Sequence, residues 1–394
     1  MKNIYSGVEK SIKDLQNIFK NTDDKDEKLK RFNQEALEVF QKLESKSLKE
    51  LESLKNNEEW EKFTIAFYGE TGAGKSTLIE CLRLFFKEPS KMDQQERFKR
   101  LYSNYQNNYQ NDERKKQNIL NELHSLQDGA TIGDGRSDFT LKTRSYSFQY
   151  NHQNFILLDV PGIEGDEQKV IDQISNATQK AHAIFYVTKT PNPPQKGEER
   201  KEGTIEKIQR QLGSQTEVWT IFNKPINSPR ALKDGLIDEN EKESLKILNE
   251  KMKAILGKHY EGHQIVSAQA AFYGLSSALL PETDFYKNKQ KFLAIFKVEE
   301  LLLKSHFKQL GKFIAGTLLE NSRKKIIESN CNKALKVIEK LQKAIVTTID
   351  REIDPTIKEI RDKLPETYSN LDRSRDKFVS NLNNSVSKET AIQN

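Results

Sequence analysis

The chain of 394 residues has few cysteines, few tryptophans and no long hydrophobic run. Its two cysteines, Cys81 and Cys331, lie far apart, which excludes a disulfide-rich scaffold and favours a reducing, cytoplasmic compartment. No apolar stretch reaches the roughly 18–20 residues that a membrane-spanning helix requires. The first residues contain no apolar segment typical of a secretory signal peptide. The sequence therefore predicts a soluble, cytoplasmic protein whose contact with a membrane would be peripheral, at the inner face.

Neither sign of charge predominates, because 64 basic residues are balanced by 58 acidic ones and the formal net charge is +6. So small an excess does not indicate nucleic-acid binding, and no nucleic-acid partner is expected. The six histidines show no metal-ligand spacing, so a zinc site is not predicted. Tyr102, Tyr105 and Tyr109 stand at helical spacing among polar residues. Two interpretations stay open for them: packing on the domain, or stacking on single-stranded nucleic acid.

Three compositions follow one another along the chain. Residues 1–58 are rich in Lys and Glu, residues 60–285 alternate short β-rich runs with polar helical segments, and residues 286–394 return to helical spacing. The expected strands are 63–68, 155–158, 183–187, 218–222 and 264–266. Such runs are typical of buried parallel strands separated by helices. The sequence therefore predicts an N-terminal helical arm, an α/β domain and a C-terminal helical segment.

Two features modify the predicted α/β domain. Residues 140–150 alternate strictly between apolar and polar side chains and are followed by the turn-forming residues 151–154. This pattern predicts a hairpin with the next strand, which adds an antiparallel edge to the sheet. Residues 88–130 are polar and have helical spacing, so we expect them to form a helical insertion.

Apolar residues in both ends of the chain recur at spacings of three and four, which places them on one helix face. The clearest series is Ile327, Cys331, Ala334, Ile338, Leu341 and Ile345. This spacing is typical of helices that pack nearly parallel. We expect the two ends to form a bundle that buries its own apolar stripe. A coiled-coil partner and a lipid surface are the alternatives.

The strongest chemical signal is the segment GETGAGKS, Gly69 to Ser76, which follows a β-rich run and leads into a helical one. In this context GxxxxGK[ST] is a phosphate-binding loop, whose amides meet phosphate oxygens at the positive end of a helix dipole. We expect Lys75 to reach the β- and γ-phosphates and Ser76 to bind Mg²⁺. The residues predicted to contact the nucleotide here are Gly69, Glu70, Thr71, Gly72, Ala73, Gly74, Lys75, Ser76 and Thr77.

A second signal is the segment LLDVPG, in which Asp159 ends a hydrophobic strand. A carboxylate at the carboxyl end of a strand can hold the hydration shell of Mg²⁺ beside the phosphate-binding loop, because ligands bind at that edge of such sheets. Gly162 lets its own N–H approach the γ-phosphate closely. The sequence therefore predicts one site built from two separate segments.

GETGAGKS and DVPG together resemble the motifs of Ras-like and dynamin-like GTPases. The resemblance implies a P-loop GTPase sheet, GTP as substrate, GDP as product, and Mg²⁺ held by Ser76, Asp159 and a switch threonine. Thr140 matches that threonine by its place ahead of the expected edge strand, with Thr131 and Thr143 as rivals. The implied catalytic set is Lys75, Ser76, Thr140, Asp159 and Gly162.

The base-reading motif of this family, [NT]KxD, is incomplete here. Asn223 and Lys224 are present, but Ile226 stands where a carboxylate would pair with guanine. A further segment, Ser267-Ala268-Gln269, resembles the loop whose backbone N–H contacts guanine O6. The two partial motifs favour GTP, and ATP stays open because a site without a buried polar partner discriminates poorly.

The insertion and the helical ends resemble dynamin-like proteins, and the features GKSTLIECLRLFF, LLDVPGIEG and NKP are most similar to the LeoA-type bacterial group. This resemblance implies that both chain ends form a helical neck or stalk beside the GTPase sheet. It implies a homodimer through the GTPase face or a second dynamin-like partner chain. Bacterial members of this group include proteins of toxin secretion and phage defence.

Several positions depart from the family. Thr71 and Gly72 replace the polar pair with which dynamins position water and a cation, and Ile163 stands where a Ras-like enzyme has its water-orienting Gln. Glu164, Asp166 and Glu167 are either substitutes for it or a solvated acidic loop. The loop with Arg200 and Lys201 either supplies charge in trans or is a flexible linker. We therefore expect slow GTP hydrolysis. The alternative is a nucleotide-gated scaffold with little turnover, and an Era-like ribosomal GTPase is a weaker third hypothesis.

Overall fold

The computed structural model describes residues 27–55, 62–108, 113–132, 143–162, 168–195 and 217–348, with scattered positions outside these ranges. Its contacts divide the chain into two compact units. One comprises residues 57–330, and the other combines residues 1–56 with residues 331–394.

A six-stranded sheet forms the centre of the first unit, in the order β2-β3-β1-β4-β5-β6. The strands are β1 (Phe63–Gly69), β2 (Arg144–Tyr150), β3 (Gln153–Asp159), β4 (Ala183–Thr188), β5 (Val218–Asn223) and β6 (Tyr260–Val266). All neighbouring pairs are parallel except β2 and β3, which are antiparallel. The predicted α/β class with one antiparallel edge is therefore confirmed. The order reverses at β1, where sheets of this kind bind ligands at the carboxyl ends of their strands.

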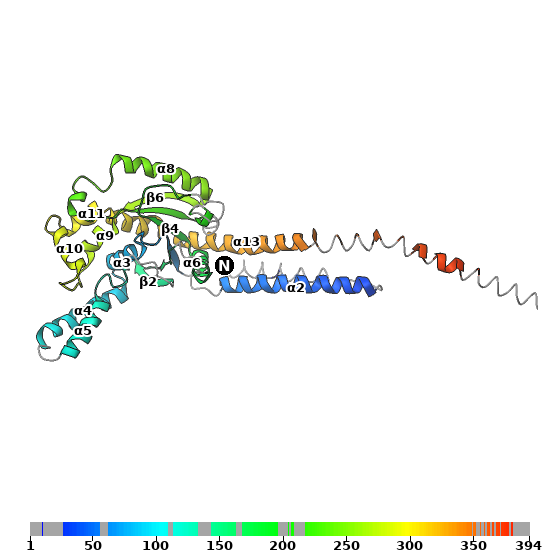
Figure 1. Ribbon diagram of the computed structural model, residues 1–394, viewed down its shortest axis with the longest axis horizontal. Coiled ribbons are helices and arrows are strands. Elements are labelled where there is room, and N and C mark those ends of the chain that lie inside the picture. The colour runs from blue at the N-terminus through cyan, green and yellow to red at the C-terminus, as the bar shows by residue number, and fades with distance from the viewer. Residues whose placement is uncertain are drawn as a thin grey trace, which may run out of the picture. The chain divides into compact units, whose positions relative to one another are not determined.

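Helices cover both faces of this sheet (Figure 1). The helices on the sheet are α3 (Lys75–Phe85), α6 (Gln168–Lys180), α8 (Glu239–Leu256), α9 (Ala268–Leu275), α10 (Asp284–Leu293), α11 (Val298–Lys304) and α12 (Phe307–Phe313). All seven residues of β1 are buried, with Ile65 and Phe67 in one apolar cluster and Ala66 and Tyr68 in the other. Because side chains alternate along a strand, β1 contributes side chains to the apolar cores on both faces of the sheet. Its end is therefore a rigid platform for the loop that follows.

The predicted insertion forms two helices, α4 (Pro89–Asn108) and α5 (Glu113–Leu126), which lie side by side (Figure 1). Phe98 and Leu123 are buried between them, together with Leu280 of the main domain. Tyr102 and Tyr105 are partly buried against this cluster, and the Phe98 and Tyr102 rings stack with centroids 5.8 Å apart. These two tyrosines thus pack as one interpretation expected, and Tyr109 lies outside the described residues.

The sheet unit extends beyond residue 285, where the sequence placed the start of a separate C-terminal segment. Phe292, Leu301 and Phe307 are almost fully buried in the same apolar cluster as the sheet. The helical spacing of this region is interrupted at His306, whose backbone adopts a positive φ of 57° and starts a new helix. Short helices that wrap the sheet therefore replace the start of the expected stalk.

The second unit contains α2 (Glu27–Lys55) and most of α13 (Ser322–Thr348), joined by an ion pair between Glu50 and Lys340. In α13, Val337 and Leu341 are buried. Leu341 belongs to the predicted stripe, while Ile327, the first residue of that stripe, is 37% exposed and lies in the first unit. Among the described residues, no helix has the length and apolarity needed to cross a membrane. The first part of the predicted N-terminal helical arm, residues 1–26, lies outside the described residues except for Lys10.

Candidate functional site

The loop between β1 and α3 has the backbone of a phosphate-binding loop. Gly72 and Gly74 adopt positive φ angles of 73° and 82°. A Cβ atom on Gly74 would also collide with the Asn223 side chain, so this position requires glycine for two reasons. The loop therefore wraps tightly before α3 begins at Lys75. This arrangement aims the first amides of α3 into the loop.

Lys75 is folded back over this loop. Its Nζ donates to the backbone oxygens of Gly69, at 2.9 Å, and Glu70, at 2.8 Å. The side chain is 7% exposed. Because carbonyl oxygens carry only partial charge, phosphate oxygens are stronger acceptors for this ammonium group. The geometry places a buried positive charge where the phosphate chain of a nucleotide would pass.

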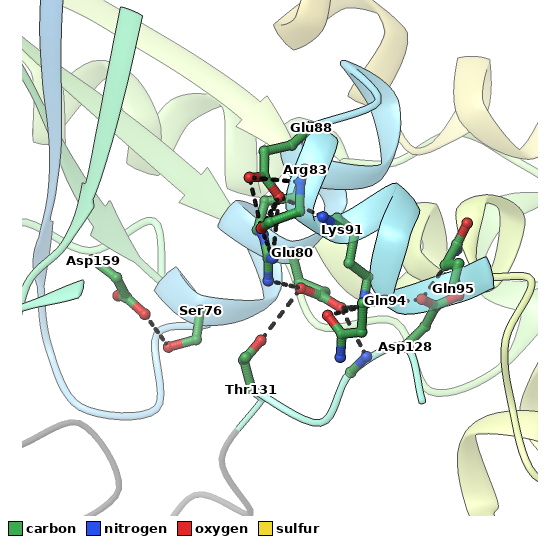
Figure 2. Close-up of polar contacts among 12 residues, drawn as sticks. Ser76, Glu80, Arg83, Glu88, Lys91, Gln94, Gln95, Asp128, Thr131 and Asp159 are labelled. Atoms are coloured by element: carbon green, nitrogen blue, oxygen red, sulfur yellow. Dashed lines mark hydrogen bonds and ion pairs between the residues drawn. The ribbon is translucent and has the colours of Figure 1, made fainter. Parts of the chain in front are cut away.

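Ser76 and Asp159 meet beside the loop, although 83 residues separate them (Figure 2). Ser76 Oγ donates to Asp159 Oδ2 at 2.8 Å. The other carboxylate oxygen, Asp159 Oδ1, is buried without a hydrogen-bond partner in the described part of the chain. Burial raises the pKa of Asp159, opposed by the hydrogen bond from Ser76 and by the charges of Lys75 and Arg144. The pair therefore carries one unsatisfied, buried acceptor.

This pair fits Mg²⁺. Carboxylate and hydroxyl oxygens are ligands that Mg²⁺ accepts, and the ion usually binds through one or two carboxylates, phosphates and water. No cluster of three or more His, Cys, Asp or Glu side chains suited to a metal occurs among the described residues. Ser76 and Asp159 would thus supply the protein ligands of an ion completed by phosphates, and Asp159 Oδ1 is the oxygen left for that purpose.

Gly162 lies directly against the phosphate-binding loop. A Cβ atom at this position would collide with Thr71 Oγ1. The segment after β3 therefore touches the loop through a residue that has no side chain. Lys75, Ser76, Asp159 and Gly162, four of the predicted catalytic residues, are thus grouped at one edge of the sheet.

Of the three candidate switch threonines, the structure describes Thr131 and Thr143. Thr131, a rival of Thr140, donates its hydroxyl to Glu80 Oε2 at 3.3 Å. The backbone N–H of Thr143, the other rival, donates to Gln173 Oε1 at 2.8 Å, and its hydroxyl is buried without a partner in the described structure. The positions that lie outside the described residues are Thr140, Ile163, Glu164, Asp166, Glu167, Arg200 and Lys201.

Asn223 joins the phosphate-binding loop to the predicted base loop. Its Nδ2 donates to the Ala73 carbonyl at 2.9 Å, and its Oδ1 accepts the Ala268 N–H at 2.9 Å. Ser267 caps α9 by accepting the Ala270 N–H. The three segments that the sequence assigned to one nucleotide are therefore connected through a single buried amide.

The loop after Asn223 is held by side chains that the sequence did not single out. Lys224 Nζ forms an ion pair with Glu241 Oε2 at 2.6 Å. The Ile226 side chain is buried, at 2% exposure, and its N–H donates to Gln269 Oε1 at 3.2 Å. Of the predicted base-reading residues, Gln269 therefore contacts the loop through its side chain.

A buried ionic network next to the site was missed by the sequence analysis (Figure 2). Lys91 Nζ lies 2.5 Å from Glu80 Oε1 and 3.0 Å from Asp128 Oδ1, and all three side chains are at most 1% exposed. Glu80 also accepts the Gly129 N–H at 2.9 Å. The signal that could have revealed it is Glu80 and Arg83 inside the apolar run of α3, since buried charges require partners.

Residues 116–224 match the family described as 50S ribosome-binding GTPase. The matched segment includes Asp159, Gly162 and Asn223 and begins after the phosphate-binding loop. No curated protein matches the chain.

Several solved structures are similar in fold. The GTP-bound GTPase-like domain of Ski7 from S. cerevisiae is 17% identical, covering 61% of this chain and 50% of that one, with a TM-score of 0.34. Bacterial selenocysteine-specific elongation factor EF-Sec is 15% identical, covering 53% and 26%, with a TM-score of 0.27. A chain of an oligomerised bacterial dynamin pair is 13% identical, covering 97% and 61%, with a TM-score of 0.33. The chain thus spans about half of the Ski7 domain and a quarter of EF-Sec.

The family match and the features of the sheet agree. The six-stranded sheet with one antiparallel edge, the phosphate-binding loop after β1 and Asp159 at the end of β3 are properties of one nucleotide-binding fold. The sheet unit therefore has the fold of a P-loop GTPase.

Proposed function

We propose that this protein binds and hydrolyses GTP in a Mg²⁺-dependent manner, as a dynamin-like GTPase. The observation that carries the proposal is the contact between Ser76 and Asp159, which leaves Asp159 Oδ1 buried beside the phosphate-binding loop. A buried acceptor without a partner is costly, and a divalent cation compensates that cost. The family match of residues 116–224 supports the same conclusion.

In this proposal each residue near the loop has a distinct task. Lys75 and the loop amides hold the phosphate chain, while Ser76 and Asp159 ligate the cation with Thr140 as the switch ligand. When bound, Mg²⁺ neutralises charge on the β- and γ-phosphate oxygens. Gly162 brings its N–H against the γ-phosphate, so loss of that phosphate as GDP forms would release the segment after β3. Glu70, Gly72, Ala73 and Thr77 complete the phosphate contacts.

Dimerisation is part of the proposal, because the departures at Thr71, Gly72 and Ile163 leave the attacking water without its usual ligands. A second copy or a second dynamin-like chain across the GTPase face would supply the missing charge, and hydrolysis would be slow without it. The helical arm 1–58 and the segment 286–394 would form the neck that follows the nucleotide state. This part rests on the resemblance of the sequence.

A second candidate is a nucleotide-gated scaffold with negligible turnover. The departures at Thr71, Gly72, Ile163 and Ile226 favour it, and isoleucine at position 163 cannot orient water. Such a protein would bind the triphosphate, change shape and signal to a partner without hydrolysing it.

The test is calorimetric binding of GTP and GDP with Mg²⁺ and with excess chelator, followed by turnover at increasing protein concentration. We expect Mg²⁺ to strengthen GTP binding, Lys75→Ala to abolish it, and specific turnover to rise with protein concentration. Binding without measurable turnover at any concentration would favour the scaffold. Unchanged nucleotide affinity in Lys75→Ala would refute both candidates.

A further inference from the structure

The loop that follows β5 has Ile226 where GTPases of the resembled kind carry a base-reading carboxylate. We infer that the base site does not read the exocyclic 2-amino group of guanine, so that guanosine and inosine nucleotides bind equally well. This inference rests on the proposed nucleotide binding and adds the substrate class: purine nucleotides irrespective of a 2-amino group.

The Ile226 side chain is turned into the protein. It is 2% exposed and belongs to the same apolar cluster as Leu232 and Leu236. The side chain at this position is therefore apolar and points into the protein, so it offers no hydrogen-bond acceptor to an amino group. The hydrophobic contacts of Ile226 also hold the loop in this orientation, because exposing the side chain would return apolar surface to water.

Glu241 is the carboxylate bonded to this loop in the described residues, and it is already engaged. Its Oε2 atom lies 2.6 Å from Lys224 Nζ and accepts the Asp238 N–H at 3.0 Å. The second contact is half of a capping box at the start of α8. Since capping stabilises the helix end, Glu241 has a local structural role. Both donors bond Oε2, so the carboxylate is held in place by the loop and by the start of α8.

Gln269 is the polar side chain that contacts the loop from the opposite segment. Its Oε1 accepts the Ile226 N–H at 3.2 Å, and its Nε2 donates to Tyr273 Oη at 3.3 Å and to Asn227 Oδ1 at 3.5 Å. Gln269 therefore positions the backbone of the loop with the same oxygen that could otherwise receive an amino group. Asn223 is engaged in the same way, since both ends of its amide are bonded to backbone.

Glu241, Gln269 and Asn223 are thus each bonded to other groups of the protein. A charge-assisted hydrogen bond between a carboxylate and the 2-amino group would make guanosine nucleotides roughly ten- to a hundredfold tighter than inosine nucleotides. Where the acceptors are already bonded, that difference disappears.

The experiment compares GDP with IDP, and GTP with ITP, in calorimetric titrations of the full chain with Mg²⁺. Inosine and guanosine nucleotides differ only in the 2-amino group, and the diphosphates exclude any effect of turnover. We expect each pair of dissociation constants to agree within about threefold. A larger preference for GDP over IDP overturns the inference and leaves nucleotide binding intact, whereas absence of all nucleotide binding refutes the proposed function.

Two variants identify a base-reading side chain if one exists. Gln269→Ala removes the acceptor of the Ile226 N–H, so we expect it to weaken GDP and IDP by the same factor. Glu241→Gln keeps the size of the side chain and removes its charge, and we expect the GDP-to-IDP ratio to stay near one. A ratio that changes in either variant shows that this residue contacts the 2-amino group, and the inference is then wrong.

Discussion

The hydroxyl group of Thr71 occupies the space that a side chain on Gly162 would need. Through this contact the phosphate-binding loop and the segment after β3 touch each other directly. Thr71 differs from the polar residue that dynamin-like proteins use in this part of the loop. Its contact with Gly162, which the sequence did not predict, links Thr71 to the segment after β3.

Gly162→Ala should separate the two segments, because the added methyl group collides with Thr71 Oγ1. We expect at least a tenfold loss of affinity for a non-hydrolysable GTP analogue and little change for GDP, which has no γ-phosphate to contact. Thr71→Gly in the Gly162→Ala background removes the colliding atoms and should recover part of the loss. Additive effects in this double-mutant cycle would contradict the contact.

Asp159→Asn should have opposite effects on stability and on metal binding. Burial raises the pKa of Asp159, so the charged form destabilises the fold, and replacing it with a neutral amide removes that cost. We expect the thermal midpoint measured in chelator to rise by about 2–4 °C per kcal/mol gained. The same variant should lose the Mg²⁺-dependent part of GTP affinity. A lower midpoint in chelator would show that the charge is stabilised by its neighbours.

The raised pKa of Asp159 also predicts a pH dependence. For a carboxyl group whose pKa is higher in the folded state, ionisation weakens the fold. The penalty is therefore present at neutral pH and disappears as the pH falls through the folded pKa. Protons should compete with Mg²⁺ over the same range, so that the Mg²⁺ contribution to GTP affinity decreases as the pH is lowered through the pKa of Asp159. Titrations of wild type and Asp159→Asn at several pH values measure this difference, which should be absent in the variant.

Asn223→Ala should weaken all nucleotides together, because Asn223 holds the Ala73 carbonyl and the Ala268 N–H in place. We expect a loss of about ten- to a hundredfold for GTP and GDP alike, from two buried hydrogen bonds of about 1 kcal/mol each and the groups left unpaired. Asn227→Ala, at an exposed position four residues further along, is the matched control and should change affinity less than twofold. A loss confined to GTP would contradict this structural role.

Lys91→Ala should destabilise the protein by about 3–5 kcal/mol, since it leaves Glu80 and Asp128 buried without their shared cation. The control is Arg97→Ala, which breaks a pair with Glu122 that is 66% and 39% exposed and should cost about 0–1 kcal/mol. Urea unfolding of both variants measures the two free energies. Equal losses would show that the buried network is no stronger than a surface pair.

The parts of this molecule that depend on local spacing were predictable. The strands, the antiparallel edge and the phosphate-binding loop follow from alternation and from GxxxxGK[ST], because neighbours in sequence specify them. The sequence also assigned Ser76 and Asp159 to one cation, and their side chains are 2.8 Å apart. The role proposed for them stays a prediction.

The features that depend on contacts between residues far apart in the sequence could not be predicted from it. Nothing near Ile226 in the sequence indicates that Gln269, 43 residues later, binds its N–H. Likewise, helical spacing alone could not separate α10–α12, which cover the sheet, from the helices beyond residue 330. The partners of a helix face are set by the tertiary fold, and periodicity specifies only that a face is buried.

The network around Glu80 has a mechanical consequence. Lys91 lies in the first turn of α4 and Glu80 belongs to α3, so the paired insertion cannot turn relative to α3 without separating buried charges. Helix α4 has 20 residues and is thus about 30 Å long. If α3 tilts by about 5°, the far end of the insertion swings by about 3 Å, and a small displacement beside the nucleotide becomes a larger one at the tip.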